Sequence, residues 1–205
     1  MEVTDSLGRS VDIFHYHLFT ARDALKGILD DSHSMVEALD LAFGEQRHAY
    51  HHATLVSEAH IHGCFHVARN MFDMFQLVNG LVLNPAIPVE RCDIWKVHEA
   101  LASSDLREEI GQLLESAWFS YVSGFVNTIK HRRLVQHSFT VSFEDNVAGI
   151  RIGAFEYRGK SHPPYSVNEV LHGVLDVKNR IVGCGRALNV LIRADARTSQ
   201  ANEGS

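Results

Sequence analysis

The longest helix signal in the sequence constrains the fold most: residues 45–79 contain no proline, and Gly63 is their only glycine. Apolar side chains recur in this segment at the three- and four-residue steps that place them on one face of an α-helix. They are Leu55, Ile61, Phe65, Ala68, Phe72, Phe75 and Val78. Gly80 and Pro85 end the pattern. At 3.6 residues per turn the predicted helix has roughly ten turns, so the other segments must pack along a long rod.

Shorter stripes of the same period predict five further helices. They cover residues 12–30, 35–42, 94–101, 106–131 and 167–193. Two of these segments begin with a capping box, in which a serine and a glutamate three residues later satisfy each other's exposed backbone N–H groups. The pairs are Ser34 with Glu37 and Ser166 with Glu169. We therefore expect a mainly all-α fold.

The apolar period changes from 3.6 to 2 after residue 137, and this alternation is typical of a half-buried β-strand. Phe139, Val141 and Phe143 alternate with polar residues, and a second β-type run ends near Tyr157. Between the two runs, residues 145–146 (Asp-Asn) have the chemistry of a tight turn. The sequence therefore predicts a two-stranded hairpin at about residues 138–157.

Together these segments predict an up-and-down helical bundle of four main helices, with the small β-hairpin inserted before the last helix. The length of 205 residues and the hydrophobic content of 45% suit one domain, which we place at residues 1–193. Trp95 and Trp118 are expected to lie in its core. Residues 194–205 are small and polar, and we expect them to form a disordered tail.

No segment of the sequence has the pattern of a membrane anchor or an export signal. No apolar run approaches the ~20 residues that span a bilayer, and residues 1–10 lack a basic region followed by an apolar run. The three cysteines, Cys64, Cys92 and Cys184, lack the close spacing of a disulfide framework or a zinc site. We therefore expect a cytoplasmic protein with no membrane partner.

A cationic segment stands out on this acidic chain. The formal net charge is -6, yet residues 116–143 contain no Asp or Glu. Lys130, Arg132 and Arg133 fall in this segment, near the predicted end of a helix. Cations in a last helical turn stabilise the helix dipole, which accounts for these residues without any function. The contrast in charge indicates an anionic partner that binds a confined patch.

Side chains that can transfer protons accompany these cations. Asn127 and His131 are four positions apart and share one face of the predicted helix, while His137 follows Arg132 after four intervening residues. Metal-free RNA cleavage needs a base for the ribose 2′-OH, an acid for the leaving oxygen and a cation for the phosphate, and His and Arg supply these near neutral pH. The candidate catalytic residues are Arg132, His137, His131 and Asn127, and the candidate RNA-binding residues are Lys130 and Arg133.

The element from Arg132 to His137, Arg-Arg-Leu-Val-Gln-His, resembles the Arg-x4-His motif of the HEPN superfamily of small prokaryotic helical domains. Residues 58–60 and 72–79 are similar in style to the same group. The resemblance implies metal-independent cleavage of RNA without a cofactor, and a homodimer whose two motifs line one cleft. It also implies a toxin–antitoxin or phage-defence context, with an antitoxin or another regulatory protein as partner.

Two positions depart from the pattern of that family. The residue after the motif arginine is commonly Asn, Asp or His, whereas here it is Arg133. A second alignment places Asn127-x3-His131 on the family's Arg-Asn-x3-His form, but Val126 then stands where the arginine should be. These departures leave open a non-catalytic domain of the same fold that binds RNA or a protein.

Histidines are unusually frequent: the chain has 14, and six of them fall within residues 48–66. Two sets in this helix follow the i, i+4 spacing of ligands in a bundle metal site. They are His48 with His52, and Glu58 with His62 and His66. A histidine-ligated metalloprotein is therefore a second alternative. Because Glu58 is the only acid in residues 46–72, a carboxylate-rich cage is disfavoured. We expect solvated or core-edge histidines and no bound metal.

Overall fold

The structure, a computed structural model, describes residues 2–26, 34–84, 86–142 and 147–203. This part of the chain is mainly helical, with a small amount of antiparallel sheet. The helices are α1 (Glu2–Leu25), α2 (Met35–Phe43), α3 (Arg47–Asn70), α4 (Met74–Leu81), α5 (Ile94–Ala100), α6 (Asp105–Glu115), α7 (Ala117–His131) and α8 (Val167–Glu203). Short 3₁₀ segments lie at Met71–Asp73 and Val89–Arg91. The strands are β1 (His137–Ser142), β2 (Val147–Ile152), β3 (Phe155–Tyr157), β4 (Lys160–His162) and β5 (Tyr165–Ser166).

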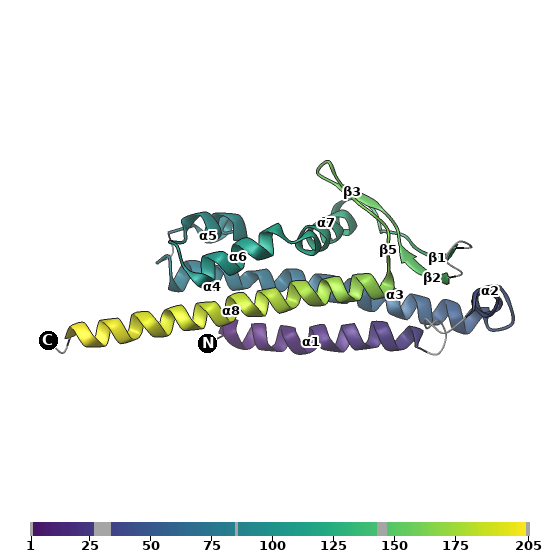
Figure 1. The fold of residues 1–205 in the computed structure, drawn as a ribbon, viewed down its shortest axis with the longest axis horizontal. Coiled ribbons are helices and arrows are strands. Elements are labelled where there is room, and N and C mark those ends of the chain that lie inside the picture. The colour runs from purple at the N-terminus through teal and green to yellow at the C-terminus, as the bar shows by residue number, and fades with distance from the viewer. Residues whose placement is uncertain (1, 27–33, 85, 143–146, 204–205) are drawn as a thin grey trace.

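The long helices α1, α3 and α8 run along the longest axis of the molecule, and α5, α6, α7 and the strands cover one side of them (Figure 1). Helix α1 packs on α3, α6 packs on α8, and α7 packs on both α3 and α8. Among the described helices, none is both long and apolar enough to cross a membrane.

Two helices that the periodicity predicted as continuous are divided. The segment 45–79 breaks at Met71–Asp73 into α3 and α4, and the segment 106–131 breaks at Ser116 into α6 and α7. Ser116 has extended backbone angles, and its hydroxyl accepts a bond from the Phe119 N–H, so it ends α6 and caps α7. Serine favours such a cap over a helix interior because its short side chain bonds nearby backbone groups.

The starts of several helices agree with the capping chemistry. Both capping boxes are formed, with the Ser34 N–H donating to Glu37 at 2.7 Å and the Ser166 N–H donating to Glu169 at 2.7 Å. Asp93 caps α5 by accepting from the Lys96 N–H.

The outer ends of the first and last helices differ from expectation. Helix α1 begins at Glu2 rather than near residue 12. Helix α8 continues to Glu203, through most of the segment 194–205 for which the composition predicted a disordered tail. Between Gly185 and Glu203 the sequence has no Gly or Pro, so nothing in the composition prevents the helix from continuing.

The predicted hairpin corresponds to β1 and β2, which pair antiparallel with His137 opposite Ile152. Its proposed turn at residues 145–146 lies outside the described residues. The prediction of a single hairpin ending at Tyr157 was incomplete. Strand β5 pairs with β2 to make a three-stranded sheet, and β3 pairs with β4 in a second hairpin. Arg158 and Gly159 connect β3 to β4 with positive φ angles of 51° and 76°, as a tight two-residue turn requires.

The core beneath the second hairpin consists of aromatic rings. Phe65 of α3 stacks on Phe125 of α7 with ring centroids 4.2 Å apart, and Phe125 lies edge-on to Phe155 of β3. Gly124 lets this hairpin approach α7, because a Cβ atom there would lie 2.8 Å from His162 Nε2. The hairpin is thereby held against the helix that carries the cationic segment.

Candidate functional site

The cationic residues predicted from the sequence lie at the exposed end of α7. Lys130, His131, Arg132 and Arg133 are all exposed. Lys130 and His131 occupy the last turn, and Arg132 is the residue at which the helix ends. Their position suits the stabilisation of the helix dipole, and it also leaves their charges open to a partner.

Arg132 joins the end of α7 to the second hairpin. Its Nη1 donates to the backbone carbonyl of Glu156 at 3.2 Å, and its guanidinium lies over the Tyr157 ring at 5.8 Å from the centroid. Arg158 lies over the same ring at 5.3 Å. Tyr157 therefore has two guanidinium groups beside it, one from α7 and one from the hairpin turn.

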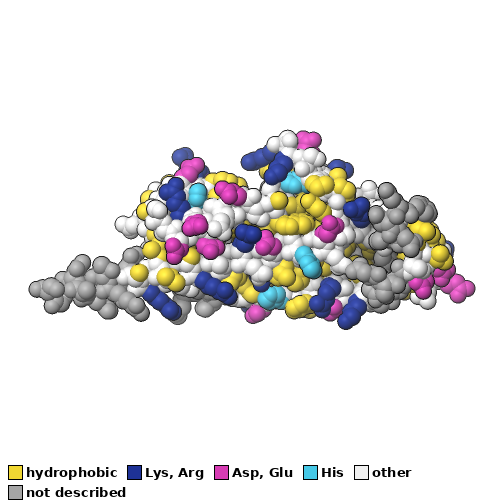
Figure 2. All heavy atoms as spheres, viewed as in Figure 1, with side chains coloured by type: hydrophobic (Ala, Val, Ile, Leu, Met, Phe, Trp, Pro, Cys, Tyr) yellow, Lys and Arg dark blue, Asp and Glu magenta, His cyan; other side chains and the backbone are white. Residues whose placement is uncertain are grey.

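Lys and Arg side chains gather where the β3–β4 hairpin projects from the molecule (Figure 2). Lys130, Arg133 and Arg158 form no ion pair with any residue that the structure describes. Glu156 is the acid of this hairpin, and Arg158 and Lys160 of the same hairpin outnumber it. The charge at this end of α7 is thus mainly positive.

A cavity of about 320 Å³ opens beside the hairpin. We call it the hairpin cavity; its lining includes Trp95, Asn127, Tyr157 and Arg158. Trp95, expected in the core, has 52% of its surface exposed. An acid, Asp93, also lines the cavity, but its carboxylate is paired with Lys96 at 3.1 Å and caps α5.

Asn127 is the predicted site residue that faces the hairpin cavity. Its Nδ2 donates to the Ser123 carbonyl one turn earlier at 2.7 Å, which fixes the orientation of the amide. His131 is one turn further along the same face of α7. The α7 helix therefore places Asn127 in the cavity and His131 beyond it, in solvent.

His137 has a different environment from the other predicted residues. It is the first residue of β1, largely buried, and its ring faces His62 of α3 with centroids 5.7 Å apart. Burial, together with the neighbouring His62, lowers the pKa of His137 to about 4. An imidazole with that pKa is neutral at pH 7, so it has no proton to donate as a general acid.

No protein-family model, curated protein or solved structure matches the chain.

A second group of side chains is brought together around His137. Glu58, His62 and His137 each offer a possible ligand atom, and these atoms all lie within 4.8 Å of one another. The i, i+4 spacing on α3 grouped Glu58 with His62 and also with His66. In the structure His66 lies near Lys130 instead. Burial lowers the pKa of His66, and the charge of Lys130 adds a smaller effect in the same direction. No local signal connects His137 to α3, because 75 positions separate it from His62 in the sequence.

The aromatic side of the hairpin cavity was also missed by the sequence reasoning. Tyr157 and Arg158 fell at the end of the predicted hairpin and were given no role. A signal was present, because Arg158-Gly159 between Tyr157 and Lys160 is a two-residue turn of the kind that closes a hairpin.

Proposed function

We propose that the chain is a HEPN-like helical bundle that binds RNA at the end of α7 and the adjacent hairpin. The observation that carries this proposal is the pairing of Arg132 and Arg158 on the Tyr157 ring at the hairpin cavity. Proteins bind single-stranded nucleic acid by stacking bases on aromatic side chains while cations hold the backbone phosphates. Tyr157 and the exposed Trp95 can supply the first interaction, and the arginines the second.

The charges around the hairpin cavity suit a phosphate backbone better than an acidic protein surface. Lys130, Arg132 and Arg133 lie within four positions of one another, the hairpin turn adds Arg158, and β4 begins with Lys160. Aromatic rings between cations are more useful to a nucleic acid, because every base offers a face that stacks. We therefore propose single-stranded RNA, rather than a partner protein, as the ligand of this surface.

Metal-independent cleavage of the bound RNA is our second candidate function. It is favoured by the exposed His131, which follows Asn127 by one turn and precedes the arginine at the end of α7. In this proposal Arg132 holds the phosphate and His131 transfers the proton. The Arg132–His137 alignment to the family motif assigns the proton transfer to His137. With a pKa of about 4, that imidazole lacks the proton of a general acid at pH 7 and is only a weak general base.

Binding is tested by fluorescence anisotropy with a labelled single-stranded RNA of mixed sequence. Arg132→Ala and Arg158→Ala should each weaken binding severalfold and reduce the slope of log K against log salt by about 1. Tyr157→Ala should lose about 1–3 kcal/mol of stacking. Arg22→Ala, which removes an exposed arginine of α1, is the matched control and should bind as wild type. Equal affinity of all four variants and wild type would exclude this surface.

Cleavage is tested on the same RNA with EDTA present, under single-turnover conditions. Loss of a proton-transfer group typically costs ~10²–10⁴-fold in rate, so His131→Ala should lose that much while its anisotropy curve changes little. If His137→Ala, still folded, loses the activity and His131→Ala does not, the Arg132–His137 alignment is correct. If wild type does not cleave the RNA, the ribonuclease proposal is wrong, whereas the RNA-binding proposal is unaffected.

A further inference from the structure

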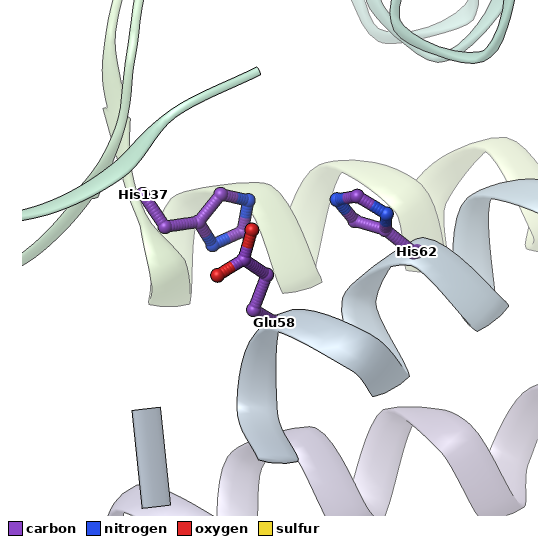
Figure 3. Close-up of side chains that lie close together, drawn as sticks. All are labelled: Glu58, His62 and His137. Carbon is purple, nitrogen blue, oxygen red and sulfur yellow. The ribbon is translucent and has the colours of Figure 1, made fainter. Parts of the chain in front are cut away.

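We propose that Glu58, His62 and His137 form a binding site for Zn²⁺. This site is separate from the proposed RNA surface, and its evidence does not depend on that function. Figure 3 shows Glu58 and His62 on successive turns of α3, both directed toward His137, whose side chain extends from the strand. Their ligand atoms lie within 4.8 Å of one another.

The backbone places these three side chains in a fixed frame. Glu58 and His62 are four positions apart on α3, so their side chains leave the same face of the helix. His137 is held from the opposite side by its pairing with Ile152, and the Gly153 N–H donates to the carbonyl of the preceding Gln136 at 2.7 Å. Such a frame resists the collapse of the three side chains into alternative contacts.

Two imidazole nitrogens in this cluster have no partner. The Nε2 atoms of His62 and His137 are both buried, and neither forms a hydrogen bond within the described part of the chain. A buried polar atom without a partner costs about 1–3 kcal/mol. His62 is additionally held by Phe125, whose ring lies edge-on at 5.4 Å. A cation between the two rings would satisfy both nitrogens with one ion.

The charge states of the cluster suit a metal. His62 and His137 would supply nitrogen ligands and Glu58 an oxygen ligand, and each of these groups binds a metal in its deprotonated form. Burial raises the pKa of Glu58, and Glu58 forms no ion pair with any residue that the structure describes. A bound divalent ion would supply that balance and favour the carboxylate.

The donor set selects the kind of ion. Two imidazoles with one carboxylate form a three-ligand zinc set that leaves a fourth position for water. Calcium and magnesium prefer several oxygen ligands, and this cluster offers a single carboxylate. Ligand atoms around tetrahedral zinc are about 3.4 Å apart, a separation that falls inside the 4.8 Å limit within which these ligand atoms lie.

Other histidine pairs in the described residues lack part of this set. His48 and His52 have the same i, i+4 spacing on α3, but both are exposed and neither belongs to a three-ligand group. His17 and His60 approach with Nδ1 atoms 3.0 Å apart, without a third ligand beside them. His48 and His52 therefore provide a control for adventitious binding to exposed imidazoles.

The test is a Zn²⁺ titration of the full chain after removal of metal with EDTA and dialysis. Isothermal calorimetry should give one ion per chain, and Co²⁺ in place of Zn²⁺ should give visible absorption bands of a low-coordinate site. His62→Ala and His137→Ala should each weaken binding at least ~10²-fold, because loss of a ligand exceeds the effect of losing an outer-shell partner. Glu58→Gln, of equal size, should also weaken it.

The matched control is the double variant His48→Ala/His52→Ala, which removes two α3 histidines at the same spacing. It should bind Zn²⁺ as wild type does. A stoichiometry below one ion per chain would overturn the proposal. So would a loss of Zn²⁺ affinity in the control as large as the loss in His137→Ala. Should His137→Ala fail to fold by circular dichroism, His137→Gln and Glu58→Gln decide the matter. RNA binding in EDTA is a separate readout, so either proposal can fail alone.

Discussion

Among the histidines that the structure describes, one is buried. His162 of β4 has 4% of its surface exposed, and its ring stacks on Phe155 with centroids 4.6 Å apart. The Tyr121 ring lies edge-on to it, and Lys160 is the neighbouring cation. A protonated imidazole at this position would be placed among aromatic rings and a like charge.

This environment predicts a pH dependence of stability. Burial, with a smaller contribution from Lys160, lowers the pKa of His162 below the usual 6.5. The unfolded chain then binds more protons than the folded one, so the stabilisation is present above pH 6.5 and is lost as pH falls below that value. Urea unfolding of wild type and His162→Gln at pH 7.5, 6.5 and 5.5 should show a steeper loss in wild type. Parallel curves would rule out a contribution from His162.

At the scale of elements, glycines in α8 mark contacts with other helices. A Cβ atom at Gly173 would overlap the Trp118 indole, while one at Gly185 would be 3.4 Å from Met74 Sδ. Trp118 cannot easily move, because its ring is also packed against Tyr165 at 4.9 Å. The glycines of α8 therefore serve packing within the chain.

Gly173→Ala should consequently be destabilising. Displacing this half-buried indole, which packs against the core, costs roughly 1–3 kcal/mol, more than the gain in helix propensity of up to about 1 kcal/mol. Gly80→Ala is the control, because a Cβ atom there meets nothing within 4 Å and Gly80 lies in α4. Thermal melts should show a lowered melting temperature for Gly173→Ala and an unchanged or raised melting temperature for Gly80→Ala. Equal melting temperatures would contradict the proposed contact.

At the scale of the whole molecule, the remaining expectation is a homodimer. The family resemblance implies a cleft shared by two chains, and two-fold dimers are the commonest oligomers. The α8 glycines contact other helices of the same chain, so they mark no surface for a second chain. Exposed apolar side chains lie elsewhere, including Tyr16 and Phe19 on α1.

Light scattering at micromolar concentration should therefore give twice the mass of the chain. The same measurement after EDTA treatment is the control, since the proposed Zn²⁺ site lies within one chain and its loss should not change the mass. A monomeric mass would exclude a cleft shared by two chains. RNA binding by a single chain would still be measured by anisotropy.

Local chemistry determined where several helices begin. Three helices are capped by the side chains of Ser34, Asp93 and Ser166, which bond to residues only three positions along the chain. Such local patterns are enough to locate the start of a helix from the sequence. The cationic end of α7 was predictable for the same reason, because its charges and its helical period are adjacent in the sequence. The mainly helical class followed from the apolar stripes.

Tertiary structure decided which distant segments meet. Ser116 interrupts a continuous apolar stripe, and only packing shows that two helices share it. His137 meets His62 because β1 is laid against α3, and Arg132 meets Tyr157 because the second hairpin folds back on α7. Periodicity reports which face of an element is buried, but not which other element buries it. The candidate Zn²⁺ site and the aromatic side of the RNA surface both depend on that second choice.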